Sequence, residues 1–204
     1  MGKAINSGLR LAAVVSAGAL ALAACGGGSS SSESSAAASG GTTAGTPGGT
    51  ITMLTNAEQW QHVDPQRMYT GADIAFFTGY TTRTLTQYKY AEGAAGTEIV
   101  PDMATDLGTP NADATSWAFT IRDGVSFEDG TPVTCADIKY GVSRTFATDI
   151  ITDGPTYAIS YLDVPKGEDG ASVYKGPFAT DPGDTAAFDA AVQCSEDNKT
   201  ITFN

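Results

Sequence analysis

The hydrophobic pattern between Trp117 and Phe127 constrains the fold more than any other feature of the chain. Large apolar residues alternate with small or polar ones, at Trp117, Phe119 and Ile121 and again at Val125 and Phe127. A period of two is typical of a strand with one buried face, so we expect these five side chains to fill a core. Asp-Gly pairs at positions 123–124 and 129–130 indicate turns.

The pattern then changes to the period of a helix. Apolar residues recur at steps of three and four, at Cys135, Ile138, Val142 and Phe146. This spacing predicts a helix with one buried face, packed on the strand before it. Thr134, followed by Asp137 three positions later, predicts a capping box at the start of the helix.

Weaker patterns predict further elements on both sides of this stretch. They are an opening strand at Thr50–Leu54, a helix from Ala72, a strand or loop at Thr81–Tyr88, a second helix from Asp184 through Val192, and a last strand at Thr200–Phe203. The last strand has the same apolar phase as Trp117–Ile121, so we expect the two to pair antiparallel. The fold class indicated is α/β, with helices and strands mixed (α+β).

The first 47 residues have the pattern of an export signal and a tether. Lys3 and Arg10 precede an apolar run too short to span a bilayer, which ends at Leu22-Ala23-Ala24-Cys25. This tetrapeptide resembles the lipobox of bacterial lipoproteins, which makes Cys25 the predicted lipidation site. An ordinary secretory signal is the alternative. We predict a signal peptide over 1–24, a lipidated Gly/Ser-rich tether over 25–47 and a folded portion over 48–204.

The charge and the scarcity of histidine exclude several function classes. The formal net charge is −12, and loss of residues 1–24 would remove two cations and no anion. We therefore expect no nucleic-acid partner. His62 is the single histidine, and no Gly-x-Ser-x-Gly motif accompanies it. The sequence thus predicts neither an enzyme nor a metal site, and no cofactor.

Two cysteines remain if Cys25 is lipidated. Cys135 and Cys194 would lie in an oxidising compartment after export, so we predict that they form a disulfide. Two independently buried thiols are the alternative.

The stretch from Trp117 to Arg144 closely resembles the hallmark of the family 5 extracellular solute-binding proteins of ABC transporters, the oligopeptide and dipeptide binders. Shorter matches precede it in the right order, at Gly48-Gly49-Thr50-Ile51, Val63-Asp64-Pro65 and 99–104. The acidic composition, rich in Ala, Gly and Thr, is similar to that of actinobacterial proteins.

The resemblance implies a class II periplasmic-binding-protein-like fold with two lobes. Residues 48–204 would then supply the N-terminal part of the first lobe and its additional subdomain, as a truncated N-terminal fragment. In the family the segment after the Asp-Pro runs along the cleft and can face an extended peptide. That segment maps onto Tyr69, Thr70 and Gly71. Tyr69 offers an aromatic face and a hydroxyl, and Gly71 allows close backbone approach.

The function implied by the resemblance is the lipid-anchored substrate-binding component of an ABC importer. Such a protein lies on the outer face of the cell membrane and delivers peptides or similar small solutes to the permease and ATPase complex. We expect it to act as a monomer. The alternative is a ligand-sensing surface lipoprotein of the same fold that is coupled to a signalling partner.

Overall fold

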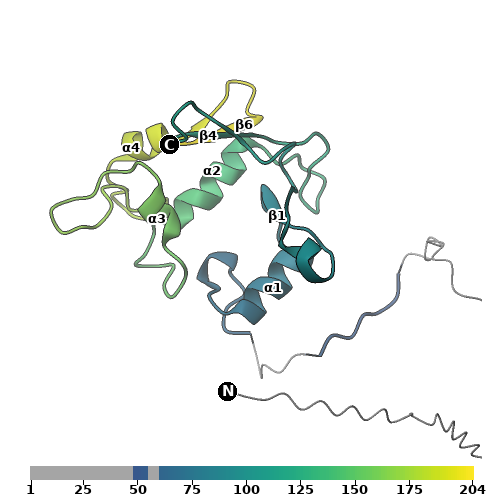
Figure 1. The fold of residues 1–204 in the computed structure, drawn as a ribbon. Coiled ribbons are helices and arrows are strands. Elements are labelled where there is room, and N and C mark those ends of the chain that lie inside the picture. The colour runs from purple at the N-terminus through teal and green to yellow at the C-terminus, as the bar shows by residue number, and fades with distance from the viewer. Residues whose placement is uncertain (1–47, 55–59) are drawn as a thin grey trace, which may run out of the picture. The chain divides into compact units, whose positions relative to one another are not determined.

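The computed structural model describes residues 48–54 and 60–204 of the chain. The chain divides into two units, Met1–Ile51 and Thr52–Asn204, and every helix and strand described belongs to the second. Helices and strands are mixed along this unit, which confirms the predicted fold class (Figure 1). The predicted signal peptide, lipidation site and tether lie outside the described residues.

The elements include two short 3₁₀ helices, η1 and η2. In chain order they are η1 (Pro65–Arg67), α1 (Gly71–Tyr80), β1 (Thr86–Tyr88), η2 (Gly93–Thr97), β2 (Ile99–Pro101), β3 (Thr109–Pro110), β4 (Trp117–Thr120), α2 (Cys135–Arg144), α3 (Tyr157–Tyr161), α4 (Thr185–Ala191), β5 (Val192–Cys194) and β6 (Thr200–Phe203).

The larger sheet joins strands from the middle and the end of the chain. Its order is β3-β4-β6-β5, and all neighbours are antiparallel. Trp117 of β4 is opposite Phe203 of β6, and Phe119 is opposite Ile201. The predicted pairing of these two segments is therefore confirmed. Because β6 has a partner on each side, Ile201 lies in the centre of the sheet and is fully buried.

Helix α2 begins as the sequence predicts. The Asp137 carboxylate accepts hydrogen bonds from the Thr134 backbone N–H at 2.8 Å and from the Thr134 hydroxyl at 2.6 Å, as part of a capping box. The helix packs mainly on β5 and β6, not on the preceding strand as its period suggested. A period identifies the apolar face of a helix but not which strand covers it, and here the partners come from the end of the chain.

The core is continuous between α2, α4 and the sheet. Phe146, Tyr174 and Phe188 form its aromatic centre, with ring centroids 4.5 to 5.5 Å apart. Cys135 and Cys194 form a disulfide with a Cα–Cα distance of 5.7 Å, which joins the start of α2 to β5. The predicted helix from Asp184 is α4, with Asp184 as its N-cap and Phe188 and Ala191 buried.

Two further predictions are wrong. Residues 50–54 form no strand, and Ile51 and Leu54 are exposed, because no strand of the described part of the chain pairs with them. Ile121 and Val125 are buried as expected, but Trp117 and Phe127 are not. Trp117 is the first residue of β4, where its Nε1–H donates to the Ala114 carbonyl at 3.3 Å, and Phe127 lines an open cavity.

Candidate functional site

The segment that follows Asp64-Pro65 is held against α2 and the loop before α3. Arg144 Nη2 at the end of α2 lies 2.6 Å from Asp64 Oδ2. The Gln66 side-chain amide donates to the Gly141 carbonyl of the same helix. Arg67 Nε donates to the Thr152 carbonyl at 3.1 Å. These contacts fix η1 and therefore the position of Tyr69, two residues beyond it.

The electrostatics of Asp64 favour its ionised form. Burial by itself would raise the pKa of this carboxyl group, but hydrogen bonds from Arg144 and from the Gln66 backbone N–H outweigh it. The pKa of Asp64 is consequently lowered, and nearby Arg67 lowers it further. Asp64 therefore stays charged at neutral pH and keeps its ion pair with Arg144.

The three predicted ligand-binding residues differ in their exposure and in whether their polar groups are already hydrogen-bonded. Tyr69 is 62% exposed and presents its ring to solvent. Thr70 is the N-cap of α1, and its hydroxyl accepts the Asp73 backbone N–H at 3.4 Å. Gly71 begins α1, and a Cβ added there would meet no atom within 4 Å. The structure thus leaves open space at Gly71, while the Thr70 hydroxyl is engaged in the helix cap.

Tyr69 is accompanied by two tyrosines of α3. The rings of Tyr157 and Tyr161 are stacked, with centroids 6.3 Å apart and planes 20° from parallel. The nearby side chain of Tyr69 raises the pKa of Tyr157 above its ordinary value. Tyr157 and Tyr161 are 58% and 81% exposed. We call Tyr69, Tyr157 and Tyr161 the tyrosine cluster; it combines aromatic surface with hydroxyl groups.

An apolar cavity of about 870 Å³ is lined by residues of the same two segments, Gln66 of η1 and Ala158 of α3. Most of its wall comes from β4, α2, β6 and the turns that follow β4. The apolar lining includes Met103, Phe119, Val125, Phe127, Val142 and Phe203. A second part of the wall is formed by residues 81–86, which run from the end of α1 to the first residue of β1.

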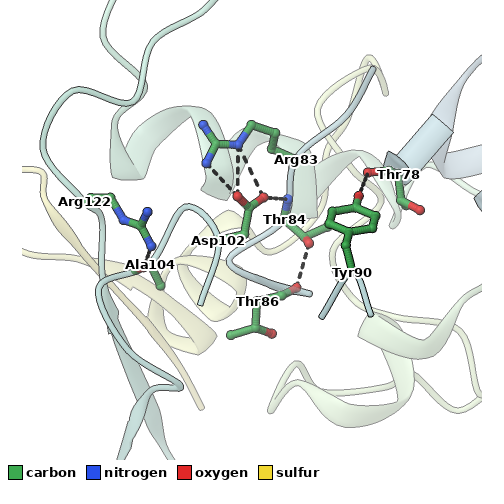
Figure 2. A network of polar contacts seen from close by, with 8 residues as sticks. All are labelled: Thr78, Arg83, Thr84, Thr86, Tyr90, Asp102, Ala104 and Arg122. Carbon is green, nitrogen blue, oxygen red and sulfur yellow. Dashed lines mark hydrogen bonds and ion pairs between the residues drawn. The ribbon is translucent and has the colours of Figure 1, made fainter. Parts of the chain in front are cut away.

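A polar network holds this second wall in place (Figure 2). Arg83 Nη2 lies 2.6 Å from Asp102 Oδ1, and Asp102 Oδ2 accepts the Thr84 backbone N–H at 3.3 Å. Asp102 is buried, and the hydrogen bond that it accepts from the Arg83 side chain raises the pKa of Arg83 above its ordinary value. The Tyr90 hydroxyl donates to the Thr78 carbonyl of α1 at 3.5 Å. Residues 81–86 are therefore tied by a charged pair to Asp102, which directly follows β2, and the chain beyond β1 is tied to α1.

The described part of the chain contains neither a cluster of metal-ligand side chains nor a membrane-spanning helix. No group of three or more His, Cys, Asp or Glu side chains is arranged there to hold a metal ion. No helix within 48–54 or 60–204 is long and apolar enough to span a membrane.

Comparison with known proteins identifies the family. Residues 98–204, more than half of the chain, match the model of the bacterial extracellular solute-binding proteins, family 5. The chain belongs to this family.

Relatives of this family 5 chain include binding proteins for peptides. It is 34% identical over 74 residues to the probable D,D-dipeptide-binding periplasmic protein DdpA of Escherichia coli (strain K12), a match that covers 36% of this chain and 14% of DdpA. Among solved structures it is similar to the clavulanic acid biosynthesis oligopeptide binding protein 2, with 28% identity and a TM-score of 0.57. That match covers 72% of this chain and 24% of the other.

The chain therefore spans about a quarter of the solved relative. A weaker likeness, to the pheromone receptor PrgZ, has 18% identity and a TM-score of 0.45. The solved relative supports a periplasmic-binding-protein-like fold for this family 5 chain.

Two parts of the site were not predicted from the sequence of this family 5 chain. Tyr157 and Tyr161 are four residues apart, which places them on one face of a helix, but the sequence gives no sign that Tyr69 lies beside that face. The apolar cavity is built from segments far apart in sequence. Each of its apolar lining residues therefore has the sequence pattern of a buried core residue. The i, i+4 tyrosine pair was the one available signal.

Proposed function

We propose that this family 5 chain is part of a lipid-anchored receptor that captures peptides or similar small solutes for an ABC importer. The observation that carries the proposal is the tyrosine cluster, because its member Tyr69 belongs to the segment that the family resemblance expects to face a ligand. The names of two relatives, a probable D,D-dipeptide-binding protein and an oligopeptide binding protein, support a peptide as the solute.

The chemistry of the cluster suits a peptide. Each tyrosine combines a large apolar ring with a hydroxyl that both donates and accepts, so it can cover a side chain and bond to a peptide group at once. The open space at Gly71 leaves room for a ligand backbone beside Tyr69. In this role the chain binds its ligand and makes or breaks no bond.

Capture would be followed by closure and delivery. A ligand shifts a receptor toward its closed state only by its greater affinity for that state. The permease would then recognise the closed form. Cys25, lipidated as the first residue after the signal peptide, would keep the receptor at the outer face of the membrane, with the Gly/Ser-rich tether allowing it to reach the permease.

The proposal is tested by saturation-transfer NMR on the 204-residue chain. A library of tripeptides is compared with a set of small sugars of similar mass, using the wild type, a Tyr69→Ala/Tyr157→Ala variant and a Tyr88→Ala control. Tyr88 is 66% exposed on β1, outside the cluster. We expect transfer to peptides in the wild type and the control, and its loss in the double variant. Equal transfer to sugars, or unchanged transfer in the double variant, contradicts the proposal.

A further inference from the structure

The two halves of the tyrosine cluster lie on segments that are far apart in sequence and are joined through the loop before α3. Arg67, two residues before Tyr69, contacts Thr152, which lies 85 positions later in the chain. Arg67 Nε donates to the Thr152 carbonyl oxygen and Nη2 donates to the Thr152 hydroxyl group, each at 3.1 Å. Nη2 also lies 3.5 Å from the carboxylate of Asp153. The planar guanidinium group thus holds three polar groups of two consecutive residues, which the single ammonium group of a lysine could not match.

Gly154 lets the two backbones approach closely at the same place. A Cβ added at this position would overlap the Gln66 carbonyl oxygen, and it would lie 2.9 Å from the Gln66 carbonyl carbon and 3.1 Å from Arg67 Cα. These are backbone atoms, so they cannot move aside as the end of a flexible side chain could. The φ angle of Gly154 lies outside the left-handed region, whereas that of Asp153 is 69°. Lack of space, and not the backbone conformation, therefore excludes a side chain at Gly154.

The connections from this contact to the tyrosines are short and restrained. Met68, the residue before Tyr69, is buried. On the other side Pro155, whose ring fixes its φ angle, directly follows residues 152–154 and is two residues before Tyr157. A shift of residues 152–154 relative to η1 should therefore move Tyr157 relative to Tyr69.

Helix α3 also has its own attachment to the core. Ala158, Ile159 and Leu162 pack against the buried apolar cluster. The segment of η1 is held separately on α2, through Asp64 and Gln66. Loss of the contact between η1 and residues 152–154 should consequently leave both segments folded and change mainly the distance between them.

We propose that Arg67 and Gly154 are positioning residues of the peptide site, which set the distance between Tyr69 and the tyrosines of α3 so that one ligand contacts both. This inference rests on the function proposed above. Both residues act through the tyrosines and not by contact with the ligand. The raised pKa of Tyr157, caused mainly by the side chain of Tyr69, agrees with this proximity.

The test compares the 204-residue chain with three variants. Arg67→Met keeps a long side chain but removes its donors, and Gly154→Ala adds a methyl group at the backbone contact. Gly79→Ala is the control, because it adds the same group to a glycine of α1 where the nearest atom, the Tyr90 hydroxyl oxygen, would be 3.9 Å from the new Cβ. Circular dichroism establishes which variants are folded, and Arg67→Met alone decides if Gly154→Ala is not. NMR measures the pKa of Tyr157 without ligand and then the saturation transfer to the tripeptide library.

We expect Arg67→Met and Gly154→Ala to move the pKa of Tyr157 toward the ordinary value for tyrosine and to lower transfer to tripeptides at least about tenfold. Gly79→Ala should change neither quantity. A Tyr157 pKa that keeps its wild-type value in Arg67→Met and Gly154→Ala overturns the proposal, as does a shifted pKa with undiminished transfer. Equal effects in Gly79→Ala overturn it as well. Absence of transfer in the wild type contradicts the proposed function instead, and the Tyr157 pKa then still decides whether Arg67 and Gly154 set the distance between the tyrosines.

Discussion

Arg144 and Asp64 form an ion pair with a 2.6 Å contact, joining the end of α2 to the residue that precedes η1. Both side chains are partly buried, at 26% and 30% exposed. The pair lies at the start of the segment that carries Tyr69, so it connects the core helix with the candidate site. Breaking it should affect both stability and the position of the tyrosine cluster.

Acidic pH should weaken the ion pair between Asp64 and Arg144. The pKa of Asp64 is lowered in the folded chain, because hydrogen bonds from Arg144 and Gln66 outweigh the opposing effect of burial. A group with a depressed folded pKa stabilises the fold above its unfolded pKa, and this contribution is lost as pH falls through the folded value. Urea unfolding between pH 3 and 7 should therefore show a smaller loss of stability below about pH 4 in Asp64→Asn than in the wild type.

The control for this experiment is Asp149→Asn, at an exposed aspartate. It should retain the acid-dependent loss of the wild type. If Asp64→Asn and Asp149→Asn have the same pH profile, the ion pair with Arg144 contributes nothing to stability.

Substitution at Tyr69 should be detectable at Tyr157. Because the nearby side chain of Tyr69 raises the pKa of Tyr157, Tyr69→Phe should move that pKa back toward the ordinary value for tyrosine. NMR titration of the ring resonances measures it directly. Tyr88→Phe, on β1, should leave the pKa of Tyr157 unchanged. An unaltered Tyr157 pKa in Tyr69→Phe would show that the two side chains do not interact.

The sequence predicted those elements whose signals are local. The capping box at Thr134 and Asp137, and the alternation that pairs Trp117–Thr120 with Thr200–Phe203, depend on residues close together in the chain or on a shared phase. The prediction of an opening strand at Thr50–Leu54 is wrong because strand formation there would depend on a partner strand and not on local residues alone. β-branched residues favour a strand only where a neighbouring strand accepts their backbone hydrogen bonds.

The candidate site was predicted only in part, because it depends on tertiary contacts. Tyr69 was found through the family resemblance, whereas its proximity to Tyr157 arises from the packing of η1 against α2 and the loop before α3. Phe127 has the pattern of a core residue and yet lines the open cavity. A hydrophobic pattern shows which side chains avoid water, but not which part of the protein covers them.

The Cys135–Cys194 bridge should stabilise the fold substantially. The two residues are separated by 59 positions, and closing a loop of that length contributes at most about 4 kcal/mol on the chain-entropy model. Cys135→Ser/Cys194→Ser should lower the free energy of unfolding by up to this amount. A reducing agent should lower it in the wild type but not in the double variant. Two free thiols in the exported protein, or equal stabilities, would contradict the prediction.

Lipidation at Cys25 is tested in cells. Cys25→Ser should abolish acylation and release the protein from the membrane fraction, since the Gly/Ser-rich residues that follow provide no apolar anchor. Mass spectrometry of the mature amino terminus measures the modification. Surface protein that begins at an unmodified Cys25 would rule out the lipoprotein interpretation.

The central claim, that the tyrosine cluster contacts a peptide, is tested most directly by titrating a tripeptide into the 204-residue chain and following each tyrosine ring by NMR. We predict progressive shifts at Tyr69, Tyr157 and Tyr161 and none at Tyr88. The fitted dissociation constant should be weaker than about 1 μM, because an exposed cluster leaves the ligand in competition with water. Shifts confined to tyrosines outside the cluster, or no shift at all, would contradict the account.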